Sequence, residues 1–293
     1  MLAHLLFLLP VSPFKPFPIL LSRMDFLTEI LNLKRARLAR AKELCSPGEM
    51  RERASDARRS AEGHRFRASV MRRDQVNIIA EVKRASPSKG IIRSEAKPSD
   101  IARSYEAGGA AAISVLTEED RFLGSLDDLR EVRSSVSLPV LRKDFIFDEF
   151  QVWEAAEAGA DALLLIAAAL DDENLARLLK ITEEDSGMDA LVEVHTKGEM
   201  RRALACGATL IGVNNRDLHT FKVSLDVSIE LARYTPRDSL LVSESGLRTG
   251  EEIKQLRDAG YSAFLIGETL MRASEPEETL RELIKEGSKG VKG

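Results

Sequence analysis

Short apolar runs alternate with amphipathic segments along the chain after Asn77. Segments such as "DIARSYEAGG", "SLDDLREVRSS", "DEFQVWEAAEAGA" and "TGEEIKQLRDAG" have the apolar spacing of helices. Apolar strands separated by helices are typical of a parallel sheet with right-handed crossovers. The runs that we interpret as strands are Ile78–Val82, Ala111–Leu116, Leu138–Leu141, Ala162–Ala167, Ala190–Val194, Leu210–Val213, Leu240–Val242 and Ala263–Ile266.

A weak internal repeat indicates that this sheet closes into a barrel. The segments "EAGGAAAISV", "EAGADALLLI", "ACGATLIGV" and "DAGYSAFLI" each run from a helix end through a glycine into a strand. Gly108, Gly159, Gly207 and Gly260 would supply the left-handed residue that ends each helix. They recur about every 50 residues, so four βαβα units predict a (β/α)8 TIM barrel. A doubly wound open sheet is the alternative, but no G-x-G-x-x-G follows the first strand.

The residues before this repeat predict additional helices. "DFLTEILNLKRARLARAKEL" has the pattern of an amphipathic helix. The basic stretch "GEMRERASDARRSAEGHRFRASVMRRD" follows it, and acidic residues interrupt its positive charge. A solvated helix face explains this stretch better than a nucleic-acid patch does. We therefore expect residues 24–293 to form a single barrel domain with extra N-terminal helices.

Residues 1–23, "MLAHLLFLLPVSPFKPFPILLSR", are apolar and rich in proline. No basic residue precedes the apolar run and no small-x-small cleavage site follows it, unlike in a signal peptide. The segment is also too short and too often broken by proline to cross a bilayer as a helix. We expect a non-native or dispensable extension with Met24 as the natural start; a targeting segment is the alternative.

Composition narrows the class of function. The chain has 293 residues, which suits one α/β barrel, and 44% of them are hydrophobic. Its formal net charge of −4 implies no general affinity for polyanions, and 5% aromatic residues argue against a base-stacking surface. Cys45 and Cys206 form neither a disulfide framework nor a metal-ligand pattern. We therefore expect a cytoplasmic protein that binds neither nucleic acid nor membrane.

Polar groups follow most of the predicted strands. Chemistry in such barrels takes place at the carboxyl ends of the strands. Any one of these groups could be a solvated strand end, but as a set they predict a shared mouth, because unpaired charges gathered there would be costly. Glu81 and Lys83 are two apart and share one strand face. The groups are Glu81 with Lys83, Thr117, Lys143, Glu193, Asn214 with Arg216, and Glu244 with Ser245.

Two glycine sites indicate a phosphate. "SESG" ends the seventh strand at Ser245 and Gly246, and "LIGET" ends the eighth at Gly267. Glycine lets backbone N–H groups approach an anion closely. The loops after strands seven and eight form the recurrent phosphate site of TIM barrels. A phosphorylated small molecule is therefore the expected ligand.

Seven motifs together resemble one family. They are "IIAEVKRASPSKG", "FLGSLDDL", "PVLRKDFIFDEFQ", "LVEVH", "IGVNNRDL", "VSESG" and "FLIGETLM". From about Asp25 to about Leu283 they are similar to the successive motifs of the indole-3-glycerol phosphate synthase family. The resemblance implies a lyase of tryptophan biosynthesis that converts 1-(2-carboxyphenylamino)-1-deoxyribulose 5-phosphate into indole-3-glycerol phosphate. It implies no metal and no organic cofactor, and we expect a monomer or a weak homodimer.

The resemblance also implies roles for individual residues. Lys143 would be the general acid of ring closure and Glu193 the base of dehydration, with Glu81 and Lys83 assisting. Lys83 would also hold the substrate carboxylate. The implied substrate-binding residues are Asn214, Arg216 and Glu244 around the sugar, Ser86, Gly246, Gly267 and the backbone of Glu268 around the phosphate, and Leu116 and Phe145 beside the anthranilate ring, with Ser245 as a further substrate-binding residue. For Leu116 and Phe145, simple core packing is the alternative.

Five further residues have expected roles. "RASPSKG" is expected to be a loop that folds over the substrate, restrained by Pro87 and turned at Gly90. His195 follows Glu193 by two residues and belongs either to the mouth or to the structure behind it. Cys206 and Trp153 are interpreted as buried packing residues.

Two other functions remain open on the sequence alone. A phosphoribosylanthranilate isomerase-like barrel would use a Cys or Asp acid/base pair at its strand ends, where this chain has lysines and glutamates. A non-catalytic barrel that binds a phosphorylated ligand is the other candidate, and the presence of both Lys143 and Glu193 argues against it.

Overall fold

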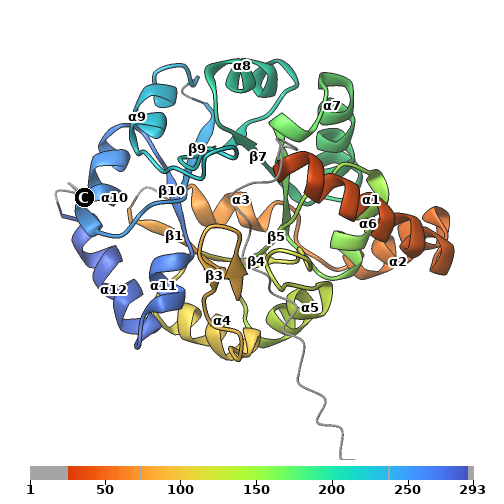
Figure 1. The fold of residues 1–293 in the computed structure, drawn as a ribbon, viewed down its shortest axis with the longest axis horizontal. Coiled ribbons are helices and arrows are strands. Elements are labelled where there is room, and N and C mark those ends of the chain that lie inside the picture. The colour runs from red at the N-terminus through yellow and green to blue at the C-terminus, as the bar shows by residue number, and fades with distance from the viewer. Residues whose placement is uncertain (1–25, 73, 237, 290–293) are drawn as a thin grey trace, which may run out of the picture.

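The computed structural model describes residues 26–72, 74–236 and 238–289, so the predicted extension 1–23 lies outside the described residues. Within those ranges, eight parallel strands close into a barrel in the order β1-β10-β9-β8-β7-β6-β5-β4, and helices surround it (Figure 1). The TIM-barrel prediction is thereby confirmed. The barrel strands are β1 (Asn77–Val82), β4 (Ala112–Leu116), β5 (Val140–Lys143), β6 (Ala162–Ile166), β7 (Asp189–Val194), β8 (Leu210–Asn214), β9 (Leu240–Glu244) and β10 (Ala263–Ile266).

Of the predicted strands, only Ala263–Ile266 agrees at both ends; five others differ by one residue, and two differ by two residues for identifiable reasons. β5 begins at Val140 rather than Leu138, because Pro139 has no N–H to donate to the ladder. β9 continues past Val242 to Glu244. The polar Ser243 obscured this continuation, but in the structure it is buried and receives a hydrogen bond from the Asn215 amide at 3.0 Å.

The segment after β1 also differs from the prediction. The expected loop contains a small antiparallel sheet of β2 (Ala85–Ser86) and β3 (Gly90–Ile91). Gly90 has a φ of 66°, as its predicted role in a turn requires. We call residues 85–91 the β2–β3 hairpin.

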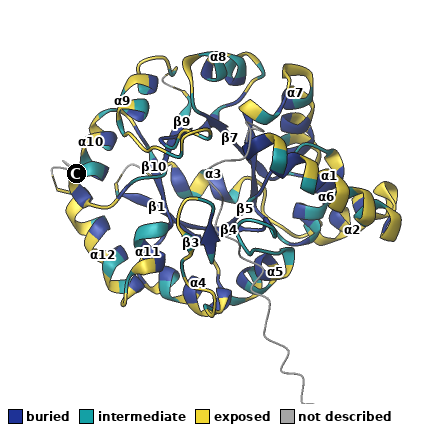
Figure 2. Cartoon of the chain, in the orientation of Figure 1, coloured by how far each residue is buried: buried dark blue, intermediate teal, exposed yellow. Residues whose placement is uncertain are grey.

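Amphipathic helices cover the outside of the barrel, as their spacing predicted. Figure 2 shows dark-blue buried strands inside a ring of helices that are buried on one side and exposed on the other. Side-chain caps begin several of them, such as Ser125, Asp148 and Thr249. The outer helices are α4 (Pro98–Ala107), α5 (Leu126–Ser135), α6 (Glu149–Glu157), η1 (Ala167–Ala169), α7 (Asp172–Lys180), η2 (Ile181–Asp185), α8 (Lys197–Ala205), α9 (Asp226–Ala232), α10 (Gly250–Asp258), α11 (Glu268–Arg272) and α12 (Pro276–Gly287).

The repeated glycines were assigned correctly in three of the four repeats. Gly159, Gly207 and Gly260 have φ values of 87°, 94° and 108°. In the first repeat the left-handed residue is Gly109, with a φ of 91°, whereas Gly108 has a φ of −74°. Gly108 meets a different need, since a Cβ on it would lie 2.9 Å from the carbonyl oxygen of Glu277 at the start of α12.

Three N-terminal helices precede the barrel: α1 (Phe26–Leu44), α2 (Pro47–Arg58) and α3 (Arg65–Val70). α3 lies at the amino ends of the strands, where its backbone bonds to Asn77 of β1 and Asp189 of β7. α1 lies at the opposite end and adds Phe26 and Ile30 to the apolar cluster inside the barrel. The barrel interior is therefore covered at both ends by helices from outside the repeat.

A buried ionic network holds α1 against β5. Lys34 of α1 contacts Asp144 at 2.9 Å, and Asp144 also contacts Arg142 at 3.0 Å. Thr117, predicted to reach the mouth, instead donates its hydroxyl to Asp144 at 2.7 Å and is buried in this network. Asp144 directly follows Lys143, so the network fixes the backbone at a predicted catalytic residue.

Of the two residues predicted to be buried packing residues, Trp153 is buried and Cys206 is not. Trp153 is buried on α6, with the guanidinium of Arg51 5.1 Å from its ring. Cys206 is partly exposed to solvent: it caps the end of α8, and its Sγ lies 3.5 Å from the carbonyl oxygen of Asp172. The prediction of a buried Cys206 was therefore wrong. Both cysteines of the chain are free.

Candidate active site

One large cavity opens at the carboxyl ends of the strands. Its volume is about 930 Å³, which is ample for a phosphorylated sugar joined to an aromatic ring. Every site residue that the resemblance implied lines this cavity except Glu244, which lies fully buried directly behind the lining; Thr117, also predicted at the mouth, does not line it. The predicted residues in the lining are Glu81, Lys83, Ser86, Leu116, Lys143, Phe145, Glu193, Asn214, Arg216, Ser245, Gly246, Gly267 and Glu268.

Lys143 lies between two carboxylates, and we call Lys143, Glu193 and Glu244 the charged floor of the cavity. Lys143 is the last residue of β5, and its Nζ lies 3.2 Å from Oε2 of Glu193 on β7. The same nitrogen lies 2.9 Å from Oε2 of Glu244 at the end of β9. Three strands that are far apart in sequence thus bring one ammonium between two carboxylates.

The buried charges of this floor shift one another's pKa. Burial opposes the charge of Lys143, but Glu244 and Glu193 outweigh it and raise the pKa of the ammonium well above its usual range. Burial would raise the pKa of Glu193, but Lys143 and His195 hold that pKa far below the ordinary value. Burial and the neighbouring Glu193 raise the pKa of Glu244 to about 7, despite the opposing effect of Lys143. The two carboxylates that share Lys143 therefore differ in their affinity for a proton.

Glu81 of β1 and Lys83, which directly follows that strand, form an ion pair. Both line the cavity, as their two-residue spacing predicted. Glu81 is held against Gly267 so closely that a Cβ at position 267 would overlap its carboxylate. Gly212 likewise leaves room for the carboxylate of Glu244. These glycines thus accommodate the two buried carboxylates, a reason for glycine that the phosphate prediction did not consider.

Replacing Gly267 with alanine is expected to displace Glu81 and to reduce kcat roughly 10²-fold, because a misplacement of about 1 Å can cost that much. The matched control is Gly48→Ala on α2, where an added Cβ meets nothing within 4 Å. Steady-state kinetics of both purified variants check this. If Gly267→Ala turns over at the rate of Gly48→Ala, the position of Glu81 is not important.

An aromatic wall of the cavity escaped sequence reasoning. Phe26, Phe122 and Phe221 line the cavity together with the predicted Phe145. The ring centroids of Phe26 and Phe145 lie 6.3 Å apart, and those of Phe26 and Phe221 lie 5.3 Å apart, both edge to face. Phe26 comes from α1, so an N-terminal helix contributes directly to the cavity. The amphipathic pattern of α1 indicated burial of Phe26 but not its partner.

The β2–β3 hairpin lies over the rim of the cavity. Pro87 and Ser88 line the cavity, and the Arg216 guanidinium donates to the Ser88 hydroxyl at 3.2 Å. Lys89 of the hairpin contacts Glu268 of α11 at 3.6 Å. The hairpin is therefore attached to the cavity rim at two places, the segment after β8 and the start of α11.

The predicted phosphate region lies between β9 and α11. Ser245 adopts a φ of 68° and Gly246 a φ of 90°. The Asn215 amide donates to the carbonyls of Glu244 and Ser245 at 3.0 and 3.1 Å. It thereby stabilises a backbone conformation that is unfavourable for serine. Sequence reasoning assigned no role to this asparagine.

His195 lies behind the floor, not in the cavity lining. Its Nε2 is 3.3 Å from Oε1 of Glu193, and its Nδ1 is 3.2 Å from Oε2 of Glu199. Although burial lowers the tendency of the ring to hold a proton, the two carboxylates raise the pKa of His195 to about 10. Of the two alternatives, the structure thus supports a place behind the mouth.

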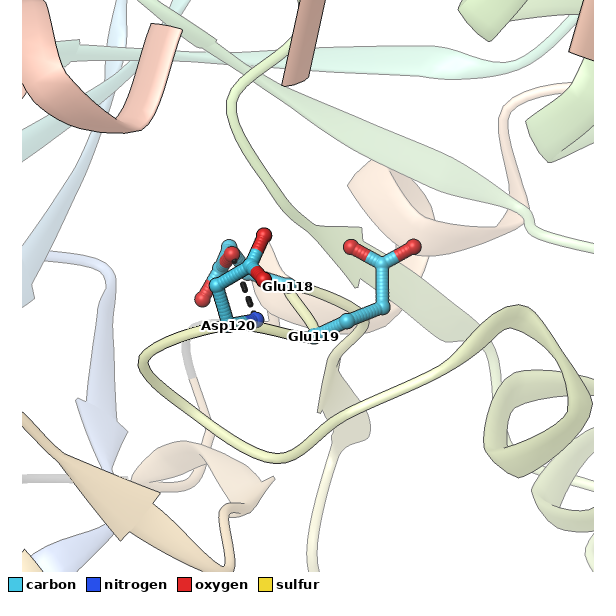
Figure 3. Close-up of side chains that lie close together, drawn as sticks. All are labelled: Glu118, Glu119 and Asp120. Carbon is cyan, nitrogen blue, oxygen red and sulfur yellow. Dashed lines mark hydrogen bonds between the residues drawn. The ribbon is translucent and has the colours of Figure 1, made fainter. Parts of the chain in front are cut away.

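Among the described residues, one acidic cluster could be considered for a metal: Glu118, Glu119 and Asp120 (Figure 3). Protein donors already occupy it. Glu118 accepts the backbone N–H groups of Asp120, Arg121 and Phe122, and its carboxylate shapes the turn after β4. Glu119 contacts Lys34, and Asp120 pairs with an arginine of α1. The cluster thus serves the turn and the attachment of α1.

No helix in the described ranges is both long and apolar enough to cross a bilayer.

Comparisons with known proteins agree with the motifs. The family model described as indole-3-glycerol phosphate synthase matches residues 27–283. The chain is 47% identical to the indole-3-glycerol phosphate synthase of Carboxydothermus hydrogenoformans over 263 residues, covering 88% of this chain and 99% of that protein. It is 51% identical to the enzyme of the same name from Lachnoclostridium phytofermentans over 218 residues, covering 74% of this chain and 80% of that protein.

Solved structures with low sequence identity share the fold. The 3-hexulose-6-phosphate synthase of Salmonella typhimurium has a TM-score of 0.58 at 12% identity, covering 72% of this chain and 98% of its own. The thiamine phosphate pyrophosphorylase of Pyrococcus furiosus has a TM-score of 0.55 at 14% identity, covering 75% and 98%. These two show the barrel alone, whereas the family model and the close sequence relatives show that this chain belongs to the indole-3-glycerol phosphate synthase family.

Proposed function

We propose that this chain closes the pyrrole ring of indole-3-glycerol phosphate with Lys143 as general acid and Glu193 as general base. The substrate is 1-(2-carboxyphenylamino)-1-deoxyribulose 5-phosphate. The observation that carries the assignment is the position of the Lys143 ammonium between Glu193 and Glu244 at the floor of the cavity.

Ring closure requires a proton donor at the ketose. The aryl carbon that bears the carboxylate attacks the ketone carbon, and the carbonyl oxygen takes a proton to become a hydroxyl. Lys143 supplies that proton. Because its carboxylate neighbours hold the proton tightly, Lys143 releases it only to the strongly basic oxygen that develops during the attack. Loss of carbon dioxide then restores the aromatic ring.

Dehydration requires a base and a second acid. Glu193 removes a proton from the carbon between nitrogen and the new hydroxyl-bearing centre, and that hydroxyl leaves as water with a proton from the Glu81–Lys83 pair. In the resting state Lys143 makes Glu193 a weak base. Once Lys143 has given its proton away, Glu193 loses a neighbouring cation and becomes more basic. The first step thereby prepares the base for the second.

The cavity lining supports one orientation of the substrate. The anthranilate ring packs against Phe145 and the aromatic wall, next to Leu116, and its carboxylate lies toward Lys83. The phosphate lies at the opposite side, near Ser86, Gly246 and the backbone of Gly267 and Glu268. The sugar hydroxyls lie between, near Asn214, Arg216, Ser245 and Glu244.

The proposed activity has a direct test. Purified protein is incubated with the carboxyphenylamino substrate, and the appearance of indole fluorescence is followed. We expect turnover without added metal or organic cofactor. Substrate binding without turnover would favour the non-catalytic barrel. In a separate incubation with the aminoribose precursor, formation of the carboxyphenylamino compound would favour the isomerase.

The β2–β3 hairpin is proposed to act as a lid that excludes water and strengthens the charge interactions beneath it. Gly90→Ala is expected to strain the hairpin at a φ of 66° and to lower kcat/KM roughly tenfold. Gly187→Ala is the matched control, because Gly187 has a φ of 67° and lies outside the cavity lining. Equal kinetics of the two variants would remove the lid from the account.

We further place the enzyme in the cytoplasm, as a monomer or weak homodimer in a single domain spanning residues 24–293. The free state of Cys45 and Cys206 supports a reducing compartment. Gel filtration across a range of protein concentrations tests the assembly state.

A further inference from the structure

His195 contacts Glu193, one of the two carboxylates beside Lys143. Its ring is 11% exposed and lies on the segment between β7 and α8. Glu199, in the first turn of α8, accepts the backbone N–H of His195 at 2.7 Å and contacts its Nδ1 at 3.2 Å. Thr196 donates to the other oxygen of Glu199 at 3.1 Å. The orientation of the imidazole is thus fixed from behind.

The front of the ring faces Glu193. Nε2 lies 3.3 Å from Oε1 of Glu193, which is close enough for an ion pair. The two atoms are not aligned for a hydrogen bond, and Nε2 has no other hydrogen-bond partner in the described structure. The other carboxylate oxygen, Oε2, contacts Lys143. Glu193 therefore has a cationic group at each of its two oxygens.

Glu244 has no such second cation among the described residues. Its Oε2 contacts Lys143, whereas its buried Oε1 has no hydrogen-bond partner in the described structure and lies against Gly212. An unpaired, buried carboxylate oxygen favours the protonated form of the acid. The geometry therefore distinguishes two glutamates that otherwise share the same lysine.

We propose that His195 is a positioning residue that keeps Glu193 ionised and aimed at the substrate, so that a proton entering the floor goes to Glu244. The inference rests on the proposed role of Glu193 as the base. His195 does not touch the substrate cavity, and it acts only through Glu193. It matters most after Lys143 has donated its proton, when His195 is the remaining cation at Glu193.

The surrounding charges are compatible with this role. Around the imidazole, Glu199 of α8 and Glu193 of β7 stabilise its positive charge, in line with the raised pKa of about 10. The segment after β8 shares a small cavity of about 190 Å³ with His195 and brings Arg216, Asp217 and Lys222 to it. Around the carboxylates, the remaining facing charges are Lys143 of β5 and Glu81 of β1. His195 thus remains charged through the neutral range.

The variant His195→Gln tests the proposal by the pH dependence of kcat. Without the cation, the pKa of Glu193 rises, so the base becomes protonated at a higher pH and the acid limb of the profile moves upward. We expect a displacement of about one pH unit or more, a roughly tenfold lower kcat on the acid side, and recovery of rate at alkaline pH. His195→Lys, which restores a positive charge, should move the limb back.

His64→Gln is the matched control, because it removes a histidine–carboxylate contact with Asp189 at the opposite end of the barrel. Its profile should equal that of the unmodified enzyme. A purely structural role predicts a uniform loss of kcat at every pH, or an unmoved acid limb, in His195→Gln. Either result overturns the proposal when the carboxyl titration described next also leaves the Glu193 midpoint in place.

Infrared titration of the carboxyl groups separates this inference from the assignment of the base. Glu193→Gln and Glu244→Gln identify the two carboxyl signals. If His195→Gln raises the midpoint of the Glu193 signal, His195 acts as proposed even if the rate does not follow it, and in that case the assignment of Glu193 as base fails. If the Glu193 midpoint stays in place, the role of His195 is refuted whatever the rate does.

Discussion

Lys143→Met is expected to lower kcat roughly 10²-fold or more, the scale of a lost general acid. Methionine retains an unbranched apolar side chain but cannot protonate the ketose oxygen. It also leaves Glu193 and Glu244 facing each other without the ammonium between them. Because the two carboxylates cannot then both be ionised at low cost, one of them takes up a proton. KM should change much less than kcat, since the phosphate and aromatic regions stay intact.

The control for this variant is Lys180→Met at the end of α7, where the lysine side chain is 67% exposed. Circular dichroism and thermal unfolding establish that both variants are folded. Activity of folded Lys143→Met close to that of Lys180→Met would remove Lys143 from the mechanism.

Glu193→Gln is expected to lower the rate of indole formation by about 10²- to 10⁴-fold, the range for a general base. The amide keeps the shape of the side chain, and its carbonyl oxygen can still accept a hydrogen bond from Lys143, but it cannot take a proton from the substrate. Ring closure depends on Lys143, so decarboxylation should be less affected than dehydration. Release of carbon dioxide is therefore expected to run ahead of indole fluorescence in a single turnover.

Glu184→Gln in η2, where the side chain is 68% exposed, is the matched control. A quenched time course with substrate labelled in the carboxylate measures both products in one reaction. Equal slowing of carbon dioxide and indole in Glu193→Gln would assign Glu193 to the first step instead of the second.

The strand ends could be predicted because the alternation of apolar runs and helices is local information. It predicts that Glu81, Lys143 and Glu193 lie at one end of a barrel, where all three line the cavity. The same reasoning failed where the position of a side chain depends on a residue that is distant in sequence. Thr117 turned toward Asp144 because a buried carboxylate needs donors, and this need is not visible in the pattern around Thr117.

Other features lay beyond sequence reasoning for the same reason. Phe26 of α1 contacts Phe145, which lies in the loop after β5. The periodicity of α1 shows which of its residues are buried, but not which residue of another element they contact. Gly212 and Gly267 leave room for Glu244 and Glu81, which come from other strands. Such close approaches depend on the register of the closed barrel, so they can be identified only from the three-dimensional structure.

A double-mutant cycle of Lys143→Met and Glu193→Gln tests the central claim most directly, namely that both residues serve one substrate in one cavity. The kcat of each single variant, of the double variant and of the unmodified enzyme is measured under one set of conditions. Residues that act as a unit show strongly non-additive losses, so we predict a double variant within about tenfold of the slower single variant. Losses that multiply would mean that the two residues act independently and would contradict the account.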